Sequence, residues 1–199
     1  MLTLIHAPQS RSSSILWLLE EIGAPYEKQI VTIRRGDGSG TADSGNPHPH
    51  HKVPALLNDG ELVIESGAIA LYLTDLFPEA KLGPKVGEKK RGAFLSWLAY
   101  RSAVVEPAMM ERRLGLQHIY GAMGWAAPDE AEALLNQHLA DNAYFLGDQF
   151  SAADVMLGGL INFMLMLKMM TETTVFRDYC ARITARPAFQ RMMELDAKK

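Results

Sequence analysis

Cysteine is nearly absent from this chain of 199 residues, since Cys180 is the only one. One thiol excludes an internal disulfide and a metal site built from several cysteines, and it favours a reducing compartment. The histidines at 48, 50 and 51 have no cysteine near them and no second ligand group at a recognisable spacing. We therefore expect a cytoplasmic protein with no metal site.

The sequence also lacks a large excess of either charge and a long hydrophobic run. With 20 Lys and Arg against 23 Asp and Glu, the net charge of −3 gives no reason to expect nucleic acid or an anionic membrane as a partner. The longest nearly apolar run covers 155–167, well short of the ~20 residues that cross a bilayer. The stretch before His6 has no basic start of the kind found in signal peptides. The expected ligand is a small molecule.

Alternating and helical patterns in the first 78 residues predict a mixed domain. A strand, a helix and a strand come first, a Gly- and Pro-rich loop follows, and a hairpin around Asn58-Asp59-Gly60 leads into a helix that ends near Pro78. The predicted ranges are 2–6, 12–23, 26–33, 34–51, 53–57 and 61–64. A βαβ unit of this length implies parallel strands. The order βαβ, loop, ββα matches the thioredoxin fold.

The rest of the chain has helical periodicity throughout. Residues 79–88 are polar and broken by Gly and Pro, which is typical of a linker between domains. The predicted helices are 89–114, 129–144, 152–170, 174–184 and 187–196. Ser151 and Asp154 have the spacing of a capping box, with Phe150 as a staple against Val155, so we assign Asp154 to helix stability. The prediction is an α+β chain, with a thioredoxin-like domain over 1–78 and an all-α domain over 89–199.

Three segments resemble the cytosolic glutathione transferase family when they are taken in order. They are "NPHPHHKVPALL", "ESGAIALYL" and "FLGDQFSAADVMLGGLI", and together the resemblance covers essentially the whole chain. It implies an enzyme that adds reduced glutathione to a hydrophobic electrophile, without a metal or prosthetic group, and that forms a homodimer. Glutathione is then a co-substrate.

The resemblance also implies a glutathione site. A cis Val53–Pro54 bond would leave the backbone of Val53 free to pair with the cysteinyl part of glutathione as one more strand. Ser66, at the start of a helix, would bind the γ-glutamyl carboxylate, Glu65 would face its ammonium group, and Lys52 would reach the glycyl carboxylate. Alternatives remain for each: a trans proline, an ordinary N-cap serine and a solvated lysine.

In the family that the chain resembles, many members use a Tyr, Ser or Cys after the first strand to activate the thiol. No Tyr or Cys lies between residues 2 and 25, so the resemblance implies a serine hydroxyl, from Ser10, Ser12, Ser13 or Ser14. Glutathione's thiol has a pKa near 8.5, and a hydrogen bond to the thiolate lowers it. Ser10 best matches the family's serine, although Ser14 stands where an arginine is common, and Ser12 is the second candidate. Both could instead be loop or N-cap serines.

The electrophile is expected to bind between the two predicted domains, at a site formed by the first loop and the first long helix of the second domain. The candidate pocket residues combine apolar and polar groups, and they are Tyr100, Arg101, Val104, Met109 and Arg113. Two other activities remain open. The chain could bind glutathione with little transferase activity, or it could be a glutathione-dependent thiol reductase or isomerase, which would normally need a cysteine near residue 10.

Overall fold

The computed structural model describes residues 1–197 and divides them into two compact units. The sheet unit contains Met1–Ala80 and, within the described residues, 186–197, and the helical unit is Lys81–Ala185. The division at Ala80 and Lys81 falls inside the segment 79–88 where the sequence predicts a linker. The structure departs from the predicted domain 89–199 at its end, because the last helix, α8 (Pro187–Ala197), belongs to the sheet unit.

The sheet has four strands in the order β2-β1-β3-β4. β1 (Leu2–His6) pairs in parallel with β2 (Glu27–Ile30), as predicted for the βαβ unit, and antiparallel with β3 (Ala55–Asn58). β4 (Glu61–Ile64) completes the predicted hairpin. β2 is shorter than the predicted 26–33, because the N–H of Thr32 donates to the carboxylate of Asp43.

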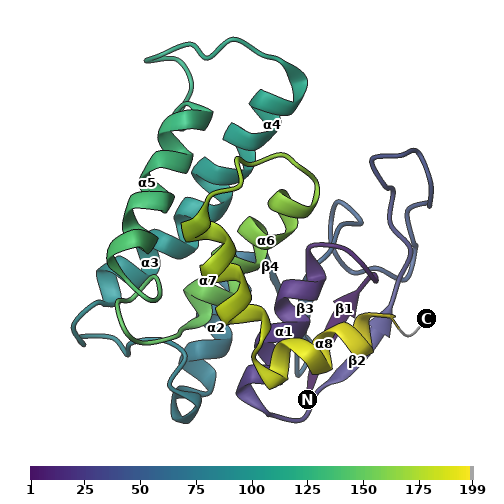
Figure 1. Ribbon diagram of the computed structural model, residues 1–199. Coiled ribbons are helices and arrows are strands. Elements are labelled where there is room, and N and C mark those ends of the chain that lie inside the picture. The colour runs from purple at the N-terminus through teal and green to yellow at the C-terminus, as the bar shows by residue number, and fades with distance from the viewer. Residues whose placement is uncertain (198–199) are drawn as a thin grey trace. The chain divides into compact units, whose positions relative to one another are not determined.

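Three helices pack in the sheet unit: α1 (Ser12–Ile22), α2 (Ser66–Leu76) and α8. α1 buries an apolar face that includes Ile15, Leu18 and Leu19, and it ends at Gly23, which has a left-handed φ of 74°. α8 lies against α1 (Figure 1). The Trp17 and Phe189 rings meet edge to face at 5.0 Å, and the Arg186 guanidinium donates to the Glu21 carboxylate at 2.7 Å. These contacts are the reason that α8 joins the sheet unit.

The helical unit contains α3 (Arg91–Tyr100), α4 (Glu106–Leu114), α5 (Pro128–Asp141), α6 (Gly159–Met166) and α7 (Thr174–Thr184). π-helical turns at Arg101–Val105 and Asp154–Gly158 interrupt the two long helices predicted over 89–114 and 152–170. The predicted helix 129–144 ends earlier, because Asn142 is extended. The predicted helix 152–170 also ends early, near Lys168, which has a φ of 55°.

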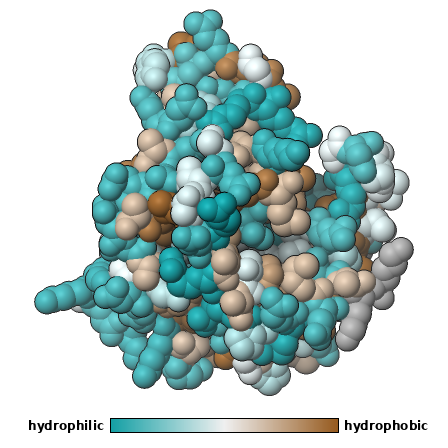
Figure 2. All heavy atoms as spheres, viewed as in Figure 1, coloured by the Kyte–Doolittle hydropathy of each residue, from teal (hydrophilic) through white to brown (hydrophobic). Residues whose placement is uncertain are grey.

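The face of the chain that is seen in Figure 2 is mainly polar. Figure 2 shows hydrophilic residues over most of the visible face, with hydrophobic ones in small separate groups. Within residues 1–197, no helix combines the length and the apolar character needed to cross a membrane.

Candidate functional site

The strand register brings three predicted site segments to one end of the sheet. Ile5, near the end of β1, pairs with Ala55, the first residue of β3, and Ala55 pairs with Ile64, the last residue of β4. The segment after β1, the Val53–Pro54 pair before β3 and the Glu65–Ser66 pair after β4 therefore meet at this end. Ala7 and Val53 belong to the same buried cluster, which agrees with this placement. We call this end of the sheet the candidate glutathione site.

Ser10 and Ser12 lie in the segment that connects β1 to α1, and their hydroxyl oxygens are 2.8 Å apart. Ser12 is fully buried, and its Oγ also lies 3.1 Å from the N–H of Ala7 and 2.8 Å from Nδ1 of His6. Ser10 is only partly buried. Its Oγ donates to the carbonyl of Ala7 at 2.7 Å and accepts from the N–H of Ser12 at 3.2 Å. Ser10 thus caps the start of α1 and is the more open end of the serine pair.

His6 continues this hydrogen-bonded chain into the interior and Asp196 lies in contact with its ring, and sequence reasoning missed both. The imidazole of His6 is fully buried at the end of β1, and its Nε2 lies 3.0 Å from Oδ1 of Asp196 on α8. Asp196 also accepts from the N–H of Gln9 at 3.0 Å and from the hydroxyl of Ser13 at 2.8 Å. Its burial raises the pKa of Asp196, but the donors His6, Ser13 and Gln9 outweigh this and hold that pKa below its usual value.

The Val53–Pro54 bond is cis, as the family resemblance implies. Val53 is buried, and within residues 1–197 neither its N–H nor its C=O has a hydrogen-bond partner. The neighbouring Lys52 is exposed, and its carbonyl accepts from the side-chain amide of Asn46 at 3.0 Å. The backbone of Val53 therefore offers one donor and one acceptor at the candidate glutathione site, and Lys52 adds a positive charge beside them.

Glu65 and Ser66 join β4 to α2. Glu65 is exposed and has a φ of 69°, a left-handed conformation that costs a non-glycine residue free energy and is concentrated at functional sites. α2 begins at Ser66, which is buried, so the N–H groups of its first turn have no partner within the helix. A carboxylate and a helix N-terminus thus lie side by side, and this arrangement suits a ligand head group that carries both charges.

The three predicted loop histidines fold as a turn. His48 is buried, and its Nδ1 accepts from the N–H of His50 at 3.0 Å. Burial lowers the pKa of His48, although the nearby Glu65 carboxylate acts in the opposite direction. Among residues 1–197, no group of three His, Cys, Asp or Glu side chains is arranged to hold a metal ion.

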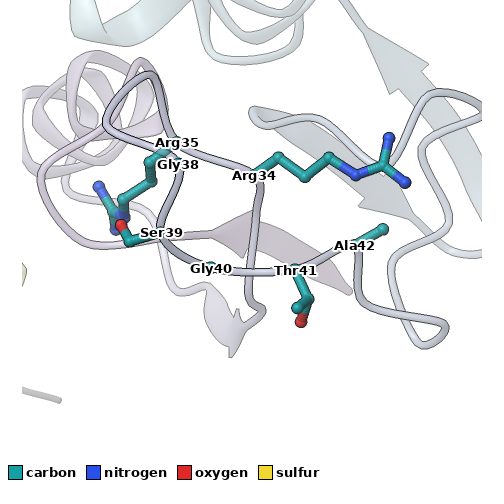
Figure 3. A pocket seen from close by; sticks show the side chains of 7 residues that line it. All are labelled: Arg34, Arg35, Gly38, Ser39, Gly40, Thr41 and Ala42. Atoms are coloured by element: carbon teal, nitrogen blue, oxygen red, sulfur yellow. The ribbon is translucent and has the colours of Figure 1, made fainter.

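The Gly-rich loop after β2 encloses a hollow of about 510 Å³, lined by Arg34, Arg35, Gly38, Ser39, Gly40, Thr41 and Ala42. Figure 3 shows the two arginine side chains extending in opposite directions from the loop. The guanidinium of Arg35 donates to the carbonyls of Pro8 at 2.8 Å and Gln9 at 3.4 Å. The loop is therefore tethered to the segment that carries Ser10.

The five residues predicted for the electrophile pocket all lie in the helical unit, on α3, α4 and the π-helical turn between them. Met109 is fully buried, and Arg101 is buried with Nη2 3.2 Å from the Glu106 carboxylate. Tyr100 and Val104 are partly exposed and Arg113 is exposed. Burial, together with the charge of Glu130, raises the pKa of Tyr100, so its hydroxyl stays a neutral donor.

Comparison with known proteins identifies the class. Residues 1–75 match the model of the glutathione S-transferase N-terminal domain, and residues 110–188 match the model of its C-terminal domain. The chain therefore belongs to the glutathione S-transferase family. This confirms the resemblance seen in the sequence and the thioredoxin-like and helical fold class.

Individual relatives cover most or nearly all of the chain. Glutathione S-transferase 3 of Schizosaccharomyces pombe is 29% identical over 77% of this chain and 70% of its own length. A glutathione transferase structure from Methylococcus capsulatus is 28% identical, has a TM-score of 0.79 and covers 98% of both chains. A sphingomonad glutathione S-transferase, solved in complex with glutathione, is 26% identical, has a TM-score of 0.77 and covers 99% of this chain and 100% of its own.

Proposed function

We propose that this protein is a glutathione transferase that binds reduced glutathione at the candidate glutathione site and adds it to a hydrophobic electrophile. The hydroxyl of Ser10 donates a hydrogen bond to the sulfur and favours the thiolate, which is the reactive form. Holding the two reactants together supplies the rest of the rate gain. Glutathione is the co-substrate, and no metal or prosthetic group takes part.

The observation that carries the proposal is the convergence of matched groups at one end of the sheet. Val53 presents an unpaired backbone donor and acceptor for a peptide. Glu65 presents a negative charge, and the helix N-terminus at Ser66 a partial positive charge, for a zwitterionic head group. Ser10 lies in the segment at the same end, as the more open of the two hydrogen-bonded serines. The glutathione complex of the sphingomonad relative supports the choice of ligand.

Ser10 is preferred over Ser12 because of burial. The Oγ of Ser12 is fully buried among protein groups, whereas Ser10 is partly exposed and can turn its O–H from the Ala7 carbonyl toward a bound sulfur. In this assignment Ser12 does not contact the sulfur and is hydrogen-bonded to Ser10. Lys52 attracts the glycyl carboxylate, while Tyr100, Val104 and Arg113 contact the electrophile and Arg101 and Met109 support them.

The test is an ultraviolet titration of the thiolate of bound glutathione in the wild type and in Ser10→Ala. A hydrogen bond to a charged group contributes about 1.5–3 kcal/mol. We therefore expect Ser10→Ala to raise the pKa of the bound thiol by about 1 to 2 units, with a parallel loss of kcat near neutral pH. Ser14→Ala, which changes a serine of the same segment outside the hydrogen-bonded chain, is the matched control.

Two results would contradict the proposal. If bound glutathione in the wild type titrates like free glutathione, the protein binds it without activating it. If Ser10→Ala titrates like the wild type while Ser12→Ala loses the shift, the catalytic hydroxyl belongs to Ser12.

We further propose that the protein acts in detoxification in the cytoplasm, as a homodimer. The single, buried Cys180 is consistent with a reducing compartment. Sedimentation of the purified chain would measure its oligomeric state directly.

A further inference from the structure

A continuous chain of polar atoms links the candidate catalytic hydroxyl to a buried carboxylate. From Ser10 Oγ it runs 2.8 Å to Ser12 Oγ, then 2.8 Å to His6 Nδ1, and from His6 Nε2 it runs 3.0 Å to Asp196 Oδ1. Ser12 and His6 are fully buried, so water cannot supply the hydrogen bonds between them. Only the Ser10 end reaches the partly open surface.

The protonation state of His6 sets the direction of the hydrogen bonds in this chain. With a neutral ring that carries its proton on Nε2, 3.0 Å from the Asp196 carboxylate, Nδ1 is an acceptor that takes the O–H of Ser12. The inward acceptors for the hydroxyl of Ser10 are then the Ser12 oxygen at 2.8 Å and the Ala7 carbonyl at 2.7 Å, so this hydroxyl points inward. With a protonated ring, Nδ1–H donates to Ser12 and Ser12 donates to Ser10, so the O–H of Ser10 can turn from the Ala7 carbonyl toward the site.

The second state suits a thiolate, since Ser12 then no longer competes with the sulfur for the O–H of Ser10. On the basis of the proposed function, we propose that His6 accepts the proton of the glutathione thiol through Ser10 and Ser12, and that Asp196 holds the resulting imidazolium. The S–H bond breaks as its proton passes to Ser10 Oγ. The proton of Ser10 passes to Ser12 and that of Ser12 to His6 Nδ1, so a thiolate and an imidazolium form from two neutral groups.

The charges around His6 favour this transfer. Asp196, on α8, is the carboxylate in contact with the ring, and its lowered pKa keeps it ionised near neutral pH. Lys28 of β2 donates to the Leu195 carbonyl and Arg35 donates to the carbonyls of Pro8 and Gln9, so both cations are bound to backbone oxygens.

The other elements packed around β1 bring no competing charge to the ring. β3 has the sequence ALLN and carries no charged residue. The acidic residues of α1, Glu20 and Glu21, lie at its far end, where they pair with Arg191 and Arg186. His6, Ser12 and Asp196 touch no substrate and act as relay residues, whereas Ser10 is the catalytic residue.

The test counts protons when glutathione binds, using calorimetry in buffers that differ in ionisation enthalpy together with the thiolate absorbance. If His6 keeps the proton, the wild type forms thiolate near neutral pH and releases almost no proton to the buffer. In His6→Gln no acceptor remains, so each thiolate formed must release a proton. There the thiol pKa should rise by about one unit, a tenfold loss of thiolate near neutral pH. Ser12→Ala should behave as His6→Gln does, and Ser14→Ala as the wild type does.

The readouts separate this inference from the proposed function. A wild type that forms thiolate and releases a full proton, with no change in His6→Gln, overturns the relay but leaves the transferase proposal standing. A wild type that forms no thiolate ends both. If His6→Gln does not fold, Ser12→Ala and Asp196→Asn decide by the same proton count. Asp196→Asn is expected to release a fraction of a proton and to leave the KM for glutathione unchanged, which a general loss of structure would not do.

Discussion

Asp154 in the helical unit and Asp196 in the sheet unit are buried carboxylates with similar partners. Asp154 accepts from the N–H groups of Phe145 and Ser151, from the Ser151 hydroxyl and from the phenol of Tyr179. Asp196 accepts from a backbone N–H and a serine hydroxyl and contacts the His6 ring. The difference lies in the ring partner, since a phenol with a raised pKa holds its proton and an imidazole can gain one.

The pKa values of Asp154 and Asp196 are shifted in opposite directions from the usual value of an aspartate. Burial raises the pKa of Asp154 to about 6, more than its four hydrogen bonds can offset. The pKa of Asp196 is lowered, because its donors outweigh its burial. A carboxylate enclosed by neutral groups stabilises a helix start, whereas one that faces an imidazole beside an open site is suited to proton chemistry.

The largest expected effect is the loss of stability when the Asp154 carboxylate is removed, compared with the loss when the Asp196 carboxylate is removed. Asp154→Ala leaves the buried donors Phe145 N–H and Tyr179 O–H unpaired, at about 1–3 kcal/mol each. We expect the free energy of unfolding of the full chain to fall by about 3–5 kcal/mol in urea titrations. Asp196→Ala should cost less, about 1–3 kcal/mol, because water can replace the acceptor at the exposed Gln9 and the partly exposed Ser13, so that only the buried His6 ring loses its partner.

Asp148→Ala is the matched control, since Asp148 is an exposed aspartate of the same unit as Asp154. Its effect should stay within about 0.5 kcal/mol. Equal losses for Asp154→Ala and Asp196→Ala would remove the distinction between the two carboxylates.

The next effect is the pH dependence of stability. The folded pKa of Asp154, about 6, lies above its unfolded value of about 3.9, so the folded state holds a proton that the unfolded state lacks between these two values. The contribution of this proton is fully present below about pH 4 and is lost as the pH rises through 6. The free energy of unfolding of the wild type, relative to that of Asp154→Asn, should therefore rise by about 2–3 kcal/mol when the pH is lowered from 7 to 4.

The pH dependence that Asp196 gives to the stability has the opposite sign. Its folded pKa is lowered, so its contribution is present above about pH 4 and is lost as the pH falls below that. The free energy of unfolding of the wild type, relative to that of Asp196→Asn, should stay constant from pH 7 to pH 5 and fall only in stronger acid. Unfolding titrations at several pH values measure both trends, and two parallel trends would show that the assigned causes are wrong.

The smallest effect concerns the packing that holds the phenol against Asp154. A Cβ on Gly158 would lie 2.5 Å from Oη of Tyr179 and 2.8 Å from Cδ1 of Ile183. Gly158→Ala should therefore destabilise the chain by about 1–3 kcal/mol through overpacking. Gly92→Ala, on α3 with open space around its position, should be neutral or stabilise by up to about 1 kcal/mol. If Gly158→Ala leaves the free energy of unfolding unchanged, Tyr179 can shift without losing stabilising contacts.

Sequence patterns predicted the parts of the fold that depend on neighbouring residues. The first strand, the hairpin around Asn58-Asp59-Gly60 and the start of the helix at Ser66 all agree with the structure. The Ser151–Asp154 capping interaction was also visible in the sequence, because its partners are three residues apart. The π-helical turns at Arg101–Val105 and Asp154–Gly158 were not, since their periodicity hardly differs from that of an α-helix.

The serine segment by itself predicted the hydroxyl candidates, and the match of three ordered segments was enough to predict the family. Tertiary structure alone decided which serine is buried, and it alone brought α8 and Asp196 to His6. The reason is physical, because Asp196 and Gln9 lie 187 residues apart and meet only when distant apolar faces pack. Local hydrogen bonds follow from spacing along the chain, whereas a relay between opposite ends of the chain exists only after the core has formed.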